Sequence, residues 1–193
     1  MTDEEILEKV RRDREEWVRF LSEPNKQERE RWIVREFLEK LSISASENDL
    51  VSLDQDNPVD VIFRDASFQV KEITEAGCRR HSEAKEDLQR AKNATQLSHL
   101  IPPMIAKDIS WDDVYPLIHQ FASSAKYPSS SRGKLDLLFY VTRKHTILNR
   151  AAQPPELAHL GWRSISCLFG PHPYVLVATG DAPSFLRSHH DGS

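Results

Sequence analysis

The sequence predicts a mixed α/β (α+β) protein in which helices flank a mixed β-sheet. Residues 135–142 are almost continuously apolar, as in a strand that is covered on both faces. Two shorter runs, residues 59–64 and 68–73, alternate apolar and polar side chains on either side of a polar break, which is typical of a β-hairpin. Charged segments with apolar residues at helical spacing precede and follow these strands. The expected core is therefore a helix, three strands, a helix and a buried strand, in that order.

The composition is that of a soluble globular protein. A chain of 193 residues with 39% hydrophobic and 29% charged residues suits one domain with a sizeable core. Its apolar runs are all shorter than the ~20 residues that span a bilayer, and its N-terminus is acidic, so we expect a cytoplasmic protein without a membrane partner. Cys78 and Cys167 lie far apart, so neither a disulfide framework nor a zinc–thiolate site is indicated. The net charge of −4 argues against a generally basic nucleic-acid coat protein.

The other elements follow from periodicity and from helix and turn signals. Residues 3–21 and 27–41 carry apolar stripes at helical spacing, and Ser110 is a candidate N-cap for a helix that begins at Trp111. Further predicted elements are a strand at 49–53, a charged helix at 79–97, a flexible loop at 127–134, strands at 164–169 and 174–179, and a short helix at 182–187. We divide this single predicted domain into an N-terminal helix (1–24), a core (27–142), a C-terminal extension (160–188) and a tail (189–193).

The hairpin brings three polar side chains onto one face of the predicted sheet. With Asp65 and Ala66 as the turn, the expected pairs are Phe63 with Phe68, Ile62 with Gln69, Val61 with Val70 and Asp60 with Lys71. Because side chains alternate between the two faces, the apolar face holds Val61, Phe63, Phe68 and Val70. Asp60, Gln69 and Lys71 then share the opposite face, within reach of one another. One carboxylate, one amide oxygen and one ammonium group converge there.

Glu30 is the unusual acidic residue of the second predicted helix. It lies one turn before Ile33 and Val34, in the middle of the apolar stripe, whereas the other glutamates of this helix point to the solvated side. A buried carboxylate is costly unless it is paired or binds a cation. The simpler interpretation is a glutamate of the first helical turn, which the helix dipole favours and which reaches water.

Basic residues cluster around the buried strand and are candidates for contacts with nucleic acid. Between residues 126 and 150 Asp136 is the single acidic residue. The predicted contacts are Arg132, Lys134, Arg143 and Lys144, and Lys126 and Arg150 belong to the same segment. The Ser-rich stretch 127–134 lacks the pattern of a nucleotide-binding P-loop, so a linker is its simpler interpretation.

These residues and their order resemble the PD-(D/E)XK nuclease superfamily, whose restriction-endonuclease-like core has the order αβββαβ. In its motif an acid begins one strand of a hairpin and an acid-x-Lys sequence lies on the next strand. Pro58-Val59-Asp60 stands for the first part, Gln69-Val70-Lys71 stands for the second, and Glu30 matches the additional glutamate of the first core helix. The resemblance covers residues 30–142 and leaves the C-terminal strands as extra strands outside it.

Within that superfamily the chain is also similar to an uncharacterised bacterial family that is proposed to contain endonucleases, the domain of unknown function 1780 family. The stretches that carry this similarity are residues 29–32, 60–66, 161–164 and 182–186. The similarity implies the fold more than the activity, because the function of that family is itself a proposal.

The resemblance implies a metal-dependent endonuclease that hydrolyses phosphodiester bonds in DNA. This reaction needs a cation to offset the charge on phosphate oxygens, together with a positioned water. Mg²⁺ (or Mn²⁺) prefers oxygen ligands, so Asp60 would be the main ligand, Glu30 a direct or water-mediated ligand, and the Val70 carbonyl another. Lys71 would orient or deprotonate the water, or stabilise the pentavalent phosphate. Many nucleases of this fold work as dimers, and this analogy leaves a homodimer open.

Gln69 departs from the superfamily motif, which has an acid at this position. The amide keeps an oxygen donor and loses a negative charge, so metal affinity should fall. The simpler interpretations are that Asp60 completes a turn with Asn57, that Lys71 forms an exposed ion pair worth less than ~1 kcal/mol, and that Gln69 is solvated. The alternative functions are a catalytically inactive nuclease-fold module that binds nucleic acid or protein, and a purely structural or regulatory protein.

Overall fold

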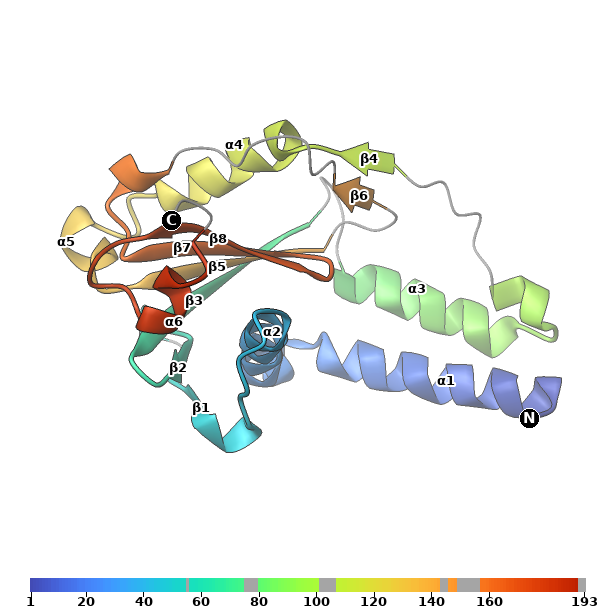
Figure 1. Ribbon diagram of the computed structural model, residues 1–193. Coiled ribbons are helices and arrows are strands. Elements are labelled where there is room, and N and C mark those ends of the chain that lie inside the picture. Colours follow the sequence, from blue (N-terminus) through green and yellow to red (C-terminus); the bar gives the residue numbers. More distant parts are fainter. Residues whose placement is uncertain (55, 75–79, 101–106, 143–145, 149–156, 191–193) are drawn as a thin grey trace. The chain divides into compact units, whose positions relative to one another are not determined.

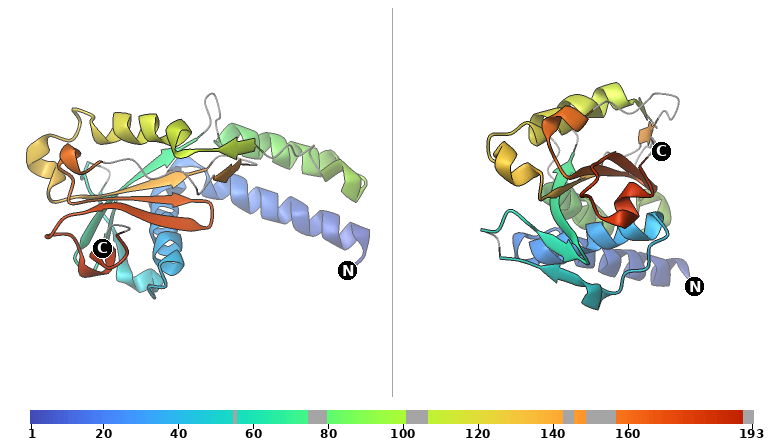
Figure 2. Two further views of the ribbon diagram at one scale, coloured as in Figure 1. Left: turned by 45° about the horizontal axis from the view of Figure 1, so that its top comes forward. Right: turned by 60° about the vertical axis from the view of Figure 1, so that its left-hand side comes forward.

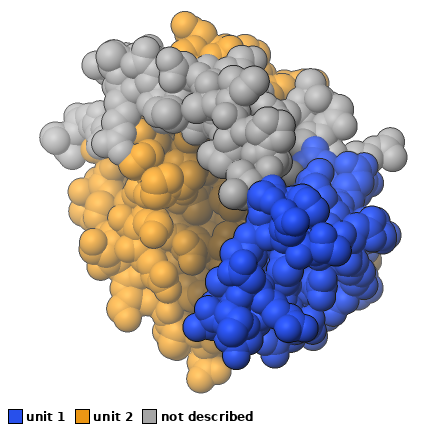
Figure 3. Space-filling model, turned by 90° about the vertical axis from the view of Figure 1, so that its right-hand side faces the viewer, with its two compact units in different colours: residues 1–29, 74–106 blue, residues 30–73, 107–193 orange. Residues whose placement is uncertain are grey.

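The computed structural model of the chain describes residues 1–54, 56–74, 80–100, 107–142, 146–148 and 157–190. They belong to two compact units (Figure 3), the first comprising residues 1–29 and 74–106, and the second residues 30–73 and 107–193. The predicted site residues all belong to the second unit. Of the helices within the described ranges, none combines the length and the apolar character needed to cross a lipid bilayer.

Two antiparallel helices make up most of the first unit. α1 (Asp3–Phe20) and α3 (Arg80–Asn93) lie side by side (Figures 1 and 2), and the 3-10 turns η1 (Glu23–Asn25) and η3 (Leu97–Leu100) accompany them. Arg11 on α1 donates hydrogen bonds to the carbonyls of Ala91 (3.2 Å) and Ala94 (3.0 Å), where α3 ends. A helix leaves its last carbonyl groups without intrahelical donors, so Arg11 supplies donors that α3 lacks. Both predicted helices of this unit are confirmed, with α3 ending at Asn93 and not near residue 97.

A six-stranded mixed sheet forms the centre of the second unit, with the strand order β1-β2-β3-β5-β7-β8. The strands are β1 (Leu50–Ser52), β2 (Val61–Phe63), β3 (Ala66–Ile73), β5 (Asp136–Val141), β7 (Ser164–Phe169) and β8 (His172–Ala178). β3, β5 and β7 are parallel to one another, and the other pairs are antiparallel. β5, the strand predicted to be covered on both faces, lies between β3 and β7. The predicted fold class is therefore confirmed.

Helices cover both faces of this sheet (Figure 1), so neighbouring residues of β3 point toward different helices. On one face α4 (Trp111–Ala122) packs through Val114 and Ile118 onto a cluster that includes Ile73. On the other face α2 (Lys26–Lys40) and α6 (Ser184–Arg187) pack onto the predicted apolar set of the hairpin, which is buried as expected: Val61, Phe63, Phe68 and Val70. Because side chains alternate along a strand, Gln69 and Lys71 point to the same face as Ile73.

The hairpin forms with a register that differs from the predicted one. Arg64 and Asp65 make the turn, because Arg64 adopts the left-handed conformation (φ 53°) that two-residue hairpin loops favour. The observed pairs are Phe63 with Ala66, Ile62 with Ser67 and Val61 with Phe68, a shift of two residues from the predicted pairs. A shift by an even number of residues leaves every side chain on its predicted face. Directly before β2 the N–H of Asp60 donates to the Phe68 carbonyl (2.8 Å), so Asp60 lies opposite Phe68 together with Val61, and not opposite Lys71.

Two further parts of the second unit differ from expectation. The stretch predicted to be a flexible loop contains the short helix α5 (Ser129–Arg132), and Tyr127 before it is buried. β4 (Lys107–Ile109) and β6 (Thr146–Leu148) form a separate parallel pair that was not predicted, because three residues are too few to show alternation. β7 and β8 confirm the two predicted C-terminal strands and extend the central sheet.

A buried carboxylate connects three strands of the sheet at the edge where β3, β5 and β7 begin. Asp136 is fully buried and forms an ion pair with Arg163, which donates through Nε and Nη2. It also accepts hydrogen bonds from the Ser67 N–H (2.8 Å) and the Ser164 hydroxyl (2.8 Å), while Arg163 donates to the carbonyl of Asp65 (3.2 Å). Four donor contacts from two other strands and the segment before β7 offset the cost of burying this charge. The network therefore has a structural role.

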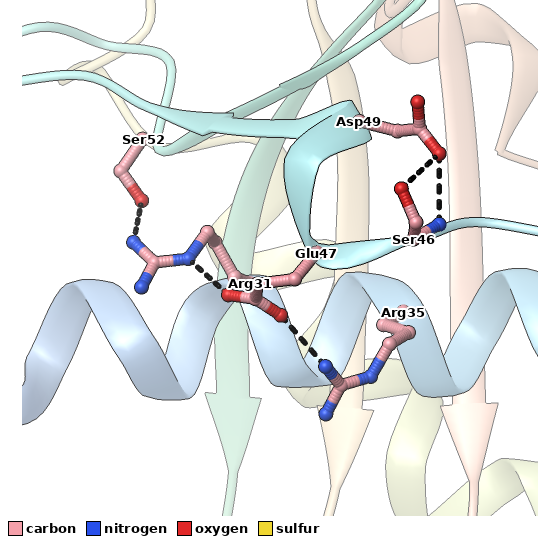
Figure 4. A network of polar contacts seen from close by, with 6 residues as sticks. All are labelled: Arg31, Arg35, Ser46, Glu47, Asp49 and Ser52. Atoms are coloured by element: carbon pink, nitrogen blue, oxygen red, sulfur yellow. Dashed lines mark hydrogen bonds and ion pairs between the residues drawn. The ribbon is translucent and has the colours of Figure 1, made fainter.

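Figure 4 shows a second polar network, which joins α2 to the segment before β1. Glu47 accepts from Arg31 (2.8 Å) and from Arg35 (2.7 Å), and Arg31 also donates to the Ser52 hydroxyl (2.8 Å). Nearby, the hydroxyl and the N–H of Ser46 donate to Asp49, and these hydrogen bonds hold the pKa of the Asp49 carboxyl below its usual range. Arg31 and Arg35 are thus engaged by an acidic partner from their own unit.

Candidate active site

Asp60 directly precedes Val61, the first residue of β2. Its backbone N–H donates to the Phe68 carbonyl (2.8 Å), and its Oδ2 accepts from the backbone N–H of Val70 (2.8 Å). β2 begins at Val61, so the carboxylate takes the acceptor position that a longer strand would have offered to Val70. The carbonyl of Val70 points to the same side of β3 as its N–H, because both groups of a strand residue face the same neighbour. The Asp60 carboxylate and the Val70 carbonyl thus both lie on the side of β3 that faces the end of β2.

A chain of hydrogen bonds leads from Asp60 into the interior. Gln69 donates from Nε2 to Oδ2 of Asp60, and its Oε1 accepts from the hydroxyl of Tyr127 (2.8 Å). Gln69 and Tyr127 are 3% and 4% exposed, whereas Asp60 is half-buried. The prediction that Gln69 lies beside Asp60 is confirmed, but the amide presents its nitrogen to the carboxylate and not its oxygen. Since an ionised carboxylate only accepts hydrogen bonds, this orientation is the one that satisfies both groups.

The ammonium group of Lys71 lies near the ring of Tyr127, the last residue of this series of hydrogen bonds. Its Nζ is 5.8 Å from the ring centroid, and Nζ of the exposed Lys126 is 5.7 Å from the same centroid. Both distances fall within the range of cation–π attraction. Trp162 packs against the ring as well, at 5.4 Å between centroids. Tyr127, which donates a hydrogen bond to Gln69, thus has two ammonium groups close to its ring.

Glu30 is buried (8% exposed) near the start of α2, one turn before Ile33 and Val34. Its burial agrees with the prediction, and the simpler interpretation of a water-exposed glutamate is not supported. α2 packs on the face that carries Phe68 and Val70, whereas Gln69 and Lys71 point to the other face. A cation shared by Glu30 and Asp60 would therefore have to lie at the end of β2, between the two faces. The joint role of these carboxylates stays a prediction.

The oxygen donors at the end of β2 suit a hard divalent cation. Asp60 and the Val70 carbonyl supply oxygen, and Mg²⁺ typically uses one or two carboxylates and keeps several waters. In the part of the chain that the structure describes, no group of three or more His, Cys, Asp or Glu side chains could hold a metal ion. A cation that binds Oδ2 of Asp60 must displace the Gln69 donor. The donor set thus fits a cation that brings much of its own hydration shell.

The predicted contacts with nucleic acid fall into three groups. Arg132 donates to the backbone carbonyls of Tyr127 (2.7 Å), Leu160 (3.1 Å) and Ser124 (3.2 Å), so its guanidinium serves to fix the segment around Tyr127. Lys134 is exposed and available to solvent. Arg143 and Lys144 lie outside the described residues, as does Arg150.

Sequence reasoning did not identify Tyr127 as part of the site, and named Lys126 only as a member of the basic segment. Tyr127 begins the stretch interpreted as a linker, and Lys126 directly precedes it. The available signal was a large aromatic residue at the entrance of a Ser-rich loop, since Tyr is usually buried at least in part and then needs a partner for its hydroxyl.

The comparisons with known proteins agree with the predicted family. A family described as "Putative endonuclease, protein of unknown function (DUF1780)" matches residues 2–192. The chain belongs to this family. No curated protein matches the sequence significantly. Among solved structures the chain is similar to a protein of unknown function from Pseudomonas aeruginosa strain PAO1, described as a member of the monooxygenase superfamily, with 26% identity and a TM-score of 0.63. That match covers 99% of this chain and 94% of the other.

Membership in the domain of unknown function 1780 family confirms the more specific of the two resemblances. The matched range includes all of the candidate site, from Glu30 to Tyr127, and the C-terminal strands as well. β7 and β8 are therefore part of the family's own domain.

Proposed function

We propose that this protein is a metal-dependent endonuclease that hydrolyses phosphodiester bonds in DNA. One observation carries the proposal: the carboxylate of Asp60 is fixed at the end of β2 by Val70 and Gln69, with the ammonium group of Lys71 on the adjacent ring of Tyr127. A fixed carboxylate beside a positive charge is what hydrolysis of a phosphate diester requires. The family description supports the same class of reaction.

Each residue has a distinct role in this proposal. Asp60 binds the cation, with the Val70 carbonyl and Glu30 as further oxygen ligands. A bound Mg²⁺ would supply positive charge to the phosphate oxygens and lower the pKa of a bound water. Lys71 holds or deprotonates the attacking water, or stabilises the charge that develops on the phosphate. The PD-(D/E)XK arrangement is thus the closest chemical parallel.

Lys126 adds a second positive charge beside the first. It is exposed, it comes from a different element than Lys71, and it lies against the same aromatic ring. A flexible ammonium group in such a position can meet a backbone phosphate of the substrate without reading its sequence. We therefore assign Lys126 and Lys134 to substrate binding and Lys71 to the reaction.

The proposal is tested by incubating the purified protein with labelled single-stranded, duplex and branched DNAs and with RNA. Each substrate is offered with Mg²⁺, Mn²⁺ or a chelator. We expect cleavage that needs the cation and that falls about 10²-fold or more in Asp60→Ala and in Lys71→Ala, because each removes a group that acts on the reacting atoms. Lys126→Ala should mainly raise the substrate concentration needed for half-maximal rate.

Glu36→Ala is the matched control, since it removes a carboxylate from the outer side of α2. It should cleave like the wild-type protein. If the folded wild-type protein cleaves nothing, even with Mn²⁺, the endonuclease proposal is wrong. Salt-dependent DNA binding that survives chelation would then favour the binding module that lacks catalytic activity.

A further inference from the structure

The orientation of the Gln69 amide decides whether a cation can bind at Oδ2 of Asp60. In the structure the amide nitrogen faces the carboxylate, so an N–H group points to the place where a cation would have to lie. Turning the amide by half a rotation about its last side-chain torsion would present the oxygen there instead. The nitrogen and oxygen of an amide are nearly equal in size, so the rotation changes little in the packing around the side chain.

The far end of the amide is held by a group that accepts either orientation. Tyr127 donates its hydroxyl hydrogen to Oε1 of Gln69 at 2.8 Å. A phenol hydroxyl both donates and accepts, so the same oxygen can accept a hydrogen bond from the amide nitrogen after the rotation. Gln69 and Tyr127 are both buried, which makes an unsatisfied group costly in either orientation. Because its hydroxyl can donate or accept, Tyr127 satisfies the buried end of the amide in both orientations.

We propose that Gln69 turns its amide when a divalent cation binds to Asp60, so that its oxygen becomes a further ligand, and that Tyr127 reverses its hydrogen bond to follow. This inference rests on the proposed cation site at Asp60. Without the cation, the nitrogen of Gln69 satisfies the carboxylate. With the cation, the carboxylate no longer needs that donor, and the amide oxygen faces the positive charge.

The rotation of the amide would explain why a glutamine stands where the motif of the PD-(D/E)XK superfamily has an acid. Two carboxylates at positions 60 and 69 would repel each other whenever the site held no cation. A glutamine forms a hydrogen bond with Asp60 in that state and still offers an oxygen when the cation is present. Gln69 is then a conditional ligand, and Tyr127 is the positioning residue that makes both states possible.

The test follows two side chains by nuclear magnetic resonance while MgCl₂ is added to the full-length protein. The protein is labelled with ¹⁵N and with tyrosine carrying ¹³C at Cζ. We expect the Nε2H₂ signals of Gln69 and the Cζ signal of Tyr127 to move with one common midpoint. The backbone N–H signal of Val70, which donates to Asp60, reports cation binding independently. The Gln69 and Tyr127 signals are assigned by their loss in Gln69→Glu and Tyr127→Phe.

The structure provides internal and variant controls. The side-chain amide of Gln89 donates to Asn93 (3.2 Å) in the first unit and should not respond. In Asp60→Asn the Gln69 signals should no longer respond over the same concentration range. A response that persists in this variant would place the cation elsewhere and overturn the inference.

The readouts separate the inference from the proposal on which it rests. If the Val70 signal moves and the Gln69 and Tyr127 signals do not, a cation binds at Asp60 but the amide does not turn, and only the inference is overturned. If none of the three signals moves at millimolar Mg²⁺, both the inference and the proposed cation site are wrong.

Discussion

Tyr127 links three features of the candidate site through one side chain. Its hydroxyl holds the buried end of Gln69, and its ring contacts the ammonium groups of Lys71 and Lys126 and the ring of Trp162. The hydroxyl and the ring can be separated by experiment, because phenylalanine keeps the ring.

We predict that Tyr127→Phe lowers the free energy of unfolding by about 1–3 kcal/mol, because it leaves the buried amide oxygen of Gln69 without its donor. Urea-induced unfolding followed by tryptophan fluorescence measures this change. Tyr115→Phe is the matched control, since Tyr115 is only half-buried and should change stability by less than about 0.5 kcal/mol. Equal stability of Tyr127→Phe and wild type would show that the hydroxyl does not hold the amide.

Cys167 carries a thiol that could act as a nucleophile, but the fold buries it completely. It is fully buried on β7, and desolvation raises the pKa of its thiol far above the usual value. Burial and the raised pKa both disfavour the reactive thiolate, so we assign Cys167 a structural role in β7.

At the scale of elements, β7 contains two buried serines whose hydroxyl groups should have opposite effects on stability. The hydroxyl of Ser164 donates to Asp136 (2.8 Å), whereas the hydroxyl of Ser166 is buried and has no hydrogen-bond partner among the described residues. The two residues are two positions apart on one strand and are equally buried, so they form a natural matched pair.

We predict that Ser164→Ala destabilises the protein by about 1.5–3 kcal/mol, since it removes a hydrogen bond to a buried charge. Ser166→Ala should instead raise stability by about 1 kcal/mol, because burying an unpaired hydroxyl is costly. Urea denaturation of the two variants measures both values. A loss of stability in Ser166→Ala of the size seen in Ser164→Ala would mean that the Ser166 hydroxyl has a partner, such as a buried water.

At the scale of the whole molecule, cation binding and folding stability are linked. A ligand that binds only the folded state stabilises it by about 2.7 kcal/mol at 100 times its dissociation constant. The proposed site at Asp60 therefore predicts that Mg²⁺ raises the unfolding free energy of the wild-type protein, and that Asp60→Asn removes this effect.

Gln69→Glu should increase the effect of Mg²⁺ on the free energy of unfolding. In chelator, a second buried carboxylate beside Asp60 lowers stability through like-charge repulsion, and Mg²⁺ relieves that repulsion. We predict a larger difference in unfolding free energy between Mg²⁺ and chelator for Gln69→Glu than for wild type, measured by urea denaturation under both conditions. The same difference in both proteins would argue against a cation between positions 60 and 69.

Local sequence patterns were enough to predict the fold class and the proximity of Asp60 and Gln69. Periodicity identified the central strand β5, the hairpin of β2 and β3, the C-terminal pair β7 and β8, and the helices α1, α2, α3 and α4. These predictions succeed because alternation and helical spacing are local properties of the chain. The apolar face of the hairpin and the proximity of Asp60 and Gln69 follow from the same local rule.

Contacts between residues far apart in the chain became visible only in the folded structure. The hairpin register was set by the left-handed conformation of Arg64, which no periodicity reveals. Tyr127 donates to Gln69, which lies 58 positions away in the chain, and so holds the buried end of the amide whose other end faces Asp60. Arg132 donates to three backbone carbonyls, a role that its position in a Ser-rich stretch did not indicate. Such outcomes depend on which hydrogen-bonding groups the folded chain brings together, and local sequence patterns do not contain that information.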